Sequence, residues 1–165
     1  MSGRFAKHLE IAVNIALLCA FLAVAAVAVK RFWPTQPARL RPTIGTKLSI
    51  DGIDWGASRG NLVLVLGVGC HYCSESAEFY KRLLPAASSA GRAVFAVLPQ
   101  PVSESRAYLS GLGLSIEAVH QSPLHSVDTG GTPTLLLVDG SGHIEKAWVG
   151  KLSREREQQV LASLR

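Results

Sequence analysis

The chain has 165 residues, of which 48% are hydrophobic and 18% charged, and its formal net charge is +5. This length accommodates one domain with its own core plus a short extra segment, and it argues against two full domains. The positive charge does not indicate nucleic-acid binding, because several of the basic residues flank an apolar segment near the N-terminus.

That apolar segment follows a short tail of residues 1–10. Residues 11–29 read IAVNIALLCAFLAVAAVAV and carry no charged side chain. As a helix this run would reach about 28 Å, close to the bilayer's hydrocarbon core of about 30 Å. Phe32 and Trp33 follow, where aromatic residues gather at a membrane interface. We therefore expect one transmembrane anchor over residues 11–29.

Two alternatives to an anchor stay open, a cleaved signal peptide and a buried soluble helix. A signal peptide has an apolar core of about 7–15 residues that ends in a small-x-small site. This run is longer and is closed by Lys30 and Arg31, although its alanines leave cleavage open. Basic residues are more numerous after the span than before it, which by the positive-inside rule favours a cytoplasmic C-terminal side.

Residues 30–43 contain three prolines and several cations, and they predict an extended tether. A folded domain is then expected over residues 44–165. One or two short edge strands are predicted around Asp51–Gly52, and the apolar run at 61–68 predicts a strand buried on both faces. Helical periodicity follows over 73–84, where Pro85 is expected to end the helix.

The second half of the domain repeats this alternation. Residues 93–99 predict another buried strand, and Ser103 is a candidate N-cap for a short helix. Two apolar runs around residues 139–142 predict a hairpin, and a helix is expected after Ser153. The fold class is therefore α/β, with a mixed sheet of parallel and antiparallel strands flanked by helices.

The motif that carries chemistry is Cys70-His71-Tyr72-Cys73, at a predicted strand-to-helix junction. The third cysteine, Cys19, lies in the apolar segment, and structural zinc normally needs four Cys or His ligands. A disulfide across so small a loop constrains the unfolded chain little, and Ser74 stands where haem attachment needs His. A redox pair fits best, because a helix start stabilises a thiolate at Cys70, and Cys73 can then attack a mixed disulfide formed on Cys70.

A second feature is Thr132-Pro133, directly before an apolar strand. Strand interiors reject proline, so a cis peptide bond that turns into the strand is one explanation. With LVLVLGVGCHYC (residues 62–73) and GTPTLLLVDGSGHIEKAWVG (residues 131–150), the chain resembles the thioredoxin-like superfamily. Within it, the chain is most similar to membrane-tethered bacterial thiol–disulfide oxidoreductases of the redoxin type.

The resemblance implies a thioredoxin-like fold in which Cys70 attacks, Cys73 resolves and the two form a disulfide. It also implies that Pro133 is a cis-proline facing the pair and that the backbone of Thr132 binds an extended substrate segment. The expected partners are protein thiols or disulfides and a membrane redox protein that recycles the pair, with no cofactor. Since disulfide exchange suits compartments outside the cytosol, we expect a periplasmic domain. The basic residues that flank the anchor favour the opposite orientation.

The sequence also departs from relatives of this family. Many have Trp before the first cysteine and Pro between the two, and thioredoxin has a buried Asp where this chain has Leu64. His71 can stabilise the thiolate, but the direction of electron flow stays open. One alternative function is a copper chaperone that uses Cys70, Cys73 and either His120 or His125 as ligands. Another is a degenerate domain that serves as an interaction platform.

Overall fold

A computed structural model describes residues 8, 14–22, 42–127 and 129–165 of the chain. The chain divides into two units, Met1–Pro37 and Ala38–Arg165. Most of the predicted tail, both ends of the predicted anchor and most of the predicted tether lie outside the described residues. Residues 14–22 are helical, and no helix within the described ranges is long and apolar enough to cross a membrane.

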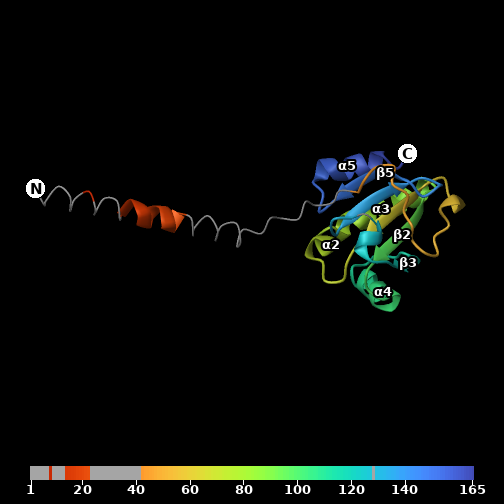
Figure 1. The fold of residues 1–165 in the computed structure, drawn as a ribbon. Helices are drawn as coiled ribbons and strands as arrows, with labels where there is room; N and C mark the ends of the chain where they lie inside the picture. The colour runs from red at the N-terminus through yellow and green to blue at the C-terminus, as the bar shows by residue number, and fades with distance from the viewer. Residues whose placement is uncertain (1–7, 9–13, 23–41, 128) are drawn as a thin grey trace, which may run out of the picture. The chain divides into compact units, whose positions relative to one another are not determined.

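The C-terminal unit is built on a five-stranded sheet in the order β3-β2-β1-β4-β5 (Figure 1). The first three strands run parallel, β4 is antiparallel to β1, and β5 is antiparallel to β4. This confirms the predicted mixed sheet and the C-terminal hairpin. The strands are β1 (Asn61–Val65), β2 (Ala93–Leu98), β3 (Ala118–Gln121), β4 (Thr134–Val138) and β5 (Ile144–Val149).

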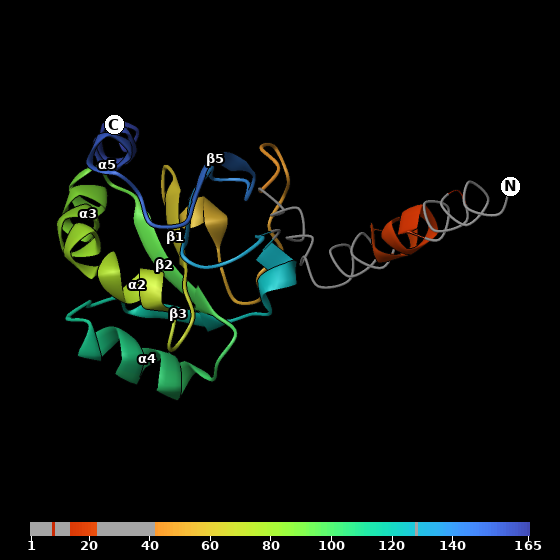
Figure 2. The same cartoon turned by 90° about the vertical axis from the view of Figure 1, so that its left-hand side faces the viewer.

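Different elements cover the two faces of the sheet (Figure 2). Leu62 and Leu64 of β1 pack with Leu83 and Val160 in a core formed with the helices. On the opposite face, Val63 packs in a second core, formed with the segment before β1 and a turn of 3-10 helix. The α-helices are α2 (His71–Glu75), α3 (Ala77–Ser89), α4 (Val102–Gly111) and α5 (Arg154–Ala162); the 3-10 helices are η1 (Trp55–Ala57) and η2 (Leu124–Val127).

Strand β1 is buried at every position, as its continuous apolar run predicts. It begins with a buried polar residue, Asn61, whose side chain joins three segments. Its amide nitrogen donates to the carbonyl oxygens of Trp55 and Asp139 at 3.2 and 3.1 Å. Its amide oxygen accepts from the Ser58 hydroxyl at 2.9 Å. Asn61 therefore ties η1 to the turn of the β4–β5 hairpin.

The prediction that Pro85 ends its helix is wrong. The first helix ends at Glu75, and after Ser76 α3 runs to Ser89 with Pro85 inside it. A proline removes one intrahelical hydrogen bond and crowds the carbonyl four residues back. That carbonyl belongs to Lys81, a solvent-exposed residue, while the buried Ala87 beyond the proline packs in the core and favours continuation of the helix.

Three smaller expectations also differ from the structure. The helix predicted to start from a Ser103 cap is capped by Pro101 and begins at Val102. Around residues 46–55 the predicted edge strands reduce to one bridge, between Lys47 and His143. Strand β3 was not predicted, because its four residues, AVHQ, carry little hydrophobic pattern.

Candidate active site

The site begins where β1 ends and the chain turns into α2. Gly69 has a φ of 75°, a left-handed conformation that glycine adopts without the strain of a Cβ. The N–H of Cys70 donates to the carbonyl oxygen of Gly67 at 3.1 Å, which closes the turn. Cys70 is then the N-cap of α2. The predicted placement of the first cysteine at a strand-to-helix junction is confirmed.

The two cysteines differ in exposure and share a hydrogen bond. Cys73 is fully buried, whereas Cys70 is half-buried. The Cys70 Sγ accepts the backbone N–H of Cys73 at 3.2 Å. The two sulfurs are at disulfide distance, with the Cα atoms 5.2 Å apart. In the reduced pair, an N–H aimed at Cys70 Sγ favours the ionised thiol there, because hydrogen bonds to the charged form lower a pKa.

The Thr132–Pro133 peptide bond is cis. The carbonyl oxygen of the buried Pro133 accepts the N–H of Gly150 at 2.7 Å, which fixes the loop against the end of β5. A Cβ placed on Gly67 would lie 3.6 Å from Thr132 Oγ1 and 3.9 Å from Cys70 Cβ. The backbone of Gly67 therefore borders both Thr132 and Cys70, so the fold brings together the two motifs that are about sixty residues apart in sequence.

His71 is exposed and takes part in a charged cluster on the surface. Its Nε2 lies 3.4 Å from Glu75 Oε1, one helical turn later, and its side chain is 78% exposed. The other carboxylate oxygen of Glu75 is 3.1 Å from the ammonium group of Lys151, which follows β5. Glu75 thus stands between a histidine next to the first cysteine and a lysine from the far end of the domain.

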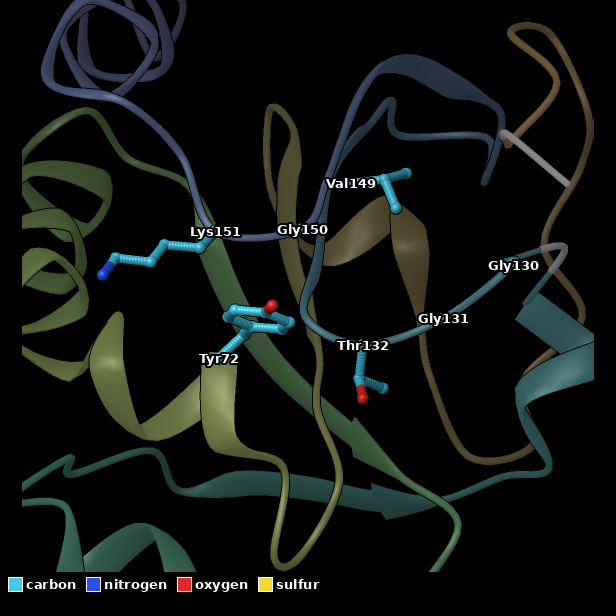
Figure 3. Close-up of a pocket in the computed structure, with 7 residues that line it drawn as sticks. All are labelled: Tyr72, Gly130, Gly131, Thr132, Val149, Gly150 and Lys151. Atoms are coloured by element: carbon cyan, nitrogen blue, oxygen red, sulfur yellow. The ribbon is translucent and has the colours of Figure 1, made fainter. Parts of the chain in front are cut away.

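A pocket of about 430 Å³ opens beside α2 (Figure 3). Tyr72, the residue before the second cysteine, forms one wall with a side chain that is 56% exposed. The opposite walls come from the loop before Pro133 and from the end of β5. The lining residues are Tyr72, Gly130, Gly131, Thr132, Val149, Gly150 and Lys151.

Several residues of this site were not predicted from the sequence. Tyr72 stands between the two cysteines of the motif, and that position was the signal that could have identified it. Glu75 and Lys151 are 76 residues apart, and no pattern in the sequence joins them.

The residues proposed for copper binding do not come together. Among the described residues, no group of three or more His, Cys, Asp or Glu side chains could hold a metal ion. His120 lies on β3 with its ring 5.8 Å from that of Phe95, and His125 lies in η2. The copper-chaperone alternative therefore finds no support in this arrangement.

Comparison with known proteins identifies the type of fold. No protein-family model matches the chain, and no curated protein matches it. Among solved structures, a Chlorobium tepidum protein assigned as thiol:disulfide interchange protein DsbE aligns with a TM-score of 0.54 at 20% identity, over 77% of this chain and 97% of its own. A thiol:disulfide interchange protein from Bacteroides sp. gives a TM-score of 0.55 at 17% identity, over 76% and 89%.

The thioredoxin domain of a thiol-disulfide oxidoreductase from Bacteroides vulgatus gives a TM-score of 0.53 at 15% identity, over 74% of this chain and 96% of that one. The chain has the thioredoxin-like fold. Within this fold the cysteines of the C-x-x-C motif form a disulfide, and the Thr132–Pro133 peptide bond is cis.

Proposed function

We propose that this protein is a membrane-anchored thiol–disulfide oxidoreductase in which Cys70 is the nucleophile and Cys73 the resolving cysteine. The observation that carries the proposal is the N–H of the buried Cys73 donated to the half-buried Cys70 Sγ. Substrate can reach the sulfur that is stabilised as a thiolate, and the second sulfur is shielded beneath it. The names of the structural neighbours point to the same chemistry.

The reaction is an exchange of disulfide bonds. The Cys70 thiolate attacks one sulfur of a protein disulfide, the substrate S–S bond breaks, and the other substrate sulfur leaves as a thiolate. Cys73 then loses its proton to solvent and attacks the Cys70 sulfur, which breaks the mixed disulfide and releases the second substrate thiolate. Two electrons pass to the substrate and the Cys70–Cys73 disulfide forms. The reverse sequence oxidises a substrate dithiol.

Two further residues have proposed roles at this centre. His71, when protonated, adds positive charge beside Cys70 and favours its thiolate. Thr132, on the loop beside the pair, offers its backbone to an extended substrate segment, while the buried Pro133 fixes the loop. The Gly67 contact shared by Thr132 and Cys70 supports this placement of the substrate.

The anchor over residues 11–29 and the periplasmic location remain part of the proposal. The uncharged apolar run supports the anchor, and the chemistry supports a compartment where disulfides persist. A membrane protein with its own dithiol or disulfide would return the pair to its starting redox state. A periplasm-dependent reporter fused after Arg165 tests the location: activity of the reporter is expected, and activity of a cytoplasm-dependent reporter in its place would contradict it.

Exchange can be tested with the full chain in a Cys19→Ser background, where Cys70 and Cys73 are the remaining thiols. The reduced protein should cleave a model disulfide, and Cys70→Ser should abolish that activity. Ser74→Ala is the matched control, because Ser74 is the exposed residue that follows the second cysteine. An unchanged rate in Cys70→Ser would refute the mechanism.

A further inference from the structure

The pocket beside the cysteine pair has a charge pattern that the exchange chemistry does not require. Tyr72 supplies an exposed aromatic side chain, and Gly130, Gly131 and Gly150 supply walls without side chains. Lys151 is the lining residue that carries a charge, and its side chain is 49% exposed. In Figure 3 the Lys151 side chain extends away from both Thr132 and the Tyr72 ring. A substrate segment in this pocket would lie beside Lys151, whose ammonium group is directed at Glu75 and would have to turn to meet it.

Lys151 is paired with Glu75 at 3.1 Å, and this pair can exchange partners. Both side chains remain partly exposed, and ion pairs between exposed groups contribute little net free energy. Glu75 also has a second partner, because His71 Nε2 lies 3.4 Å from its other oxygen. A carboxylate that enters the pocket can take Lys151 while Glu75 keeps His71. A cation that enters would meet Lys151 first, since Glu75 is not one of the lining residues.

From this arrangement we infer that Lys151 is a specificity-determining residue that selects substrate segments with an acidic side chain near the reactive cysteine, in competition with Glu75. This inference rests on the proposed exchange activity and adds the substrate class to it. Since both partners remain half in water, the preference is modest. We expect about a two- to fivefold advantage for Asp over Asn, as for other exposed ion pairs, and a smaller one in high salt.

The test uses the full chain in the Cys19→Ser background and a series of capped peptides. Each peptide has one cysteine in a disulfide with 2-mercaptoethanol, which is neutral, and carries Asp, Asn or Lys at one of the two positions on either side of that cysteine. The readout is the kcat/KM for the Asp peptide divided by the kcat/KM for the Asn peptide. A variant that changes the rate of exchange equally for both peptides leaves this ratio unchanged. The wild-type order should be Asp, then Asn, then Lys, at one or more of these positions.

Variants separate the charge of Lys151 from other effects. Lys151→Ala should bring the Asp/Asn ratio close to one, and Lys151→Arg should restore it. Glu75→Gln should raise the ratio, because the competing carboxylate is gone. Lys146→Ala is the matched control, because it also removes one lysine charge, but on β5, where Lys146 donates a hydrogen bond to the Ser163 hydroxyl. This variant should leave the Asp/Asn ratio unchanged.

The outcomes that overturn the inference are distinguishable. If the wild type cleaves the peptides without preferring Asp at any tested position, or if Lys151→Ala keeps the preference, the selection by Lys151 is refuted and the exchange activity stands. A preference for Lys would also refute it and would assign the recognition to Glu75. If the reduced wild type cleaves neither the peptides nor the neutral disulfide of 2-mercaptoethanol, the proposed function itself fails, and this inference fails with it.

Discussion

Replacement of Asn61 by Ala should destabilise the domain strongly, although the residue lies far along β1 from the cysteines. The side chain is fully buried and makes three hydrogen bonds, to the carbonyl oxygens of Trp55 and Asp139 and from the Ser58 hydroxyl. At about 0.5–1.5 kcal/mol for each bond, the free energy of unfolding should fall by about 3 kcal/mol.

That loss converts to a measurable shift in the thermal midpoint. For a domain of residues 44–165, an unfolding entropy of about 2.1 cal/mol/K per residue gives about 0.25 kcal/mol per degree, so Tm should fall by about 12 °C. The assay is thermal unfolding of the full chain, followed by circular dichroism. Gln158→Ala on the exposed face of α5 is the surface control, with an expected change within about 0.5 kcal/mol.

A second variant tests the reason for the loss. Asn61→Asp keeps the shape of the side chain but puts a carboxylate oxygen in place of the amide nitrogen. That oxygen would face the carbonyl oxygens of Trp55 and Asp139, which in the wild type accept hydrogen bonds from the amide. It should therefore destabilise the domain at least as much as Asn61→Ala. A fall in Tm of less than about 4 °C for Asn61→Ala, or a clearly more stable Asn61→Asp, would refute the reasoning about this network.

Three further predictions concern the core, the hairpin turn and the resolving cysteine. Leu83→Ala removes a fully buried side chain and should lower the free energy of unfolding by about 2–5 kcal/mol in a denaturant titration; a loss below about 1 kcal/mol would contradict the packing. Hydrogen bonds from the N–H of His143 and from the hydroxyl and N–H of Ser141 lower the pKa of Asp139 from 3.8 to about 2. The ionised carboxylate stabilises the folded domain fully above the ordinary pKa of 3.8, and this stabilisation is lost as the pH falls through the folded-state pKa of about 2. The difference in stability between wild type and Asp139→Asn should therefore shrink between pH 4 and 2. A difference that stays constant over this range would contradict the prediction. Cys73→Ser should accumulate a mixed disulfide on Cys70, detected by mass spectrometry, and prompt release of substrate would exclude the resolving role.

Much of the fold could be predicted because local patterns determine it. The continuous apolar run of β1 reflects a strand buried on both faces, and the turn at Asp139 marks the hairpin, where its carboxylate accepts the N–H of Ser141 at 2.9 Å. The sequence misled at Pro85, because local propensity was outweighed by the packing of the helix beyond it. Strand β3 was missed because its neighbour β2 stabilises it more than its own pattern does.

The candidate site also has parts that could be predicted from the sequence and parts that could not. The cysteine pair and the Thr132–Pro133 step could be found from the sequence, since each is a short motif with a local physical reason. The pairing of Glu75 with Lys151 could not be found, because it depends on how α2 packs beside the end of β5. Contacts of that kind arise from the tertiary structure and leave no periodic signal in the chain.

The proposed mechanism requires the thiol of Cys70 to be held ionised by its position at the start of α2. The most direct measurement is the rate of alkylation of Cys70 in the reduced full chain, with Cys19 replaced by Ser, over a pH series. Free cysteine ionises with a pKa of about 8.5, and the hydrogen bond from the Cys73 N–H lowers the pKa of Cys70, because it favours the charged sulfur. We expect a pKa clearly below that of free cysteine, together with closure of the Cys70–Cys73 disulfide under mild oxidant. A pKa at or above the free value, with no disulfide formed, would contradict it.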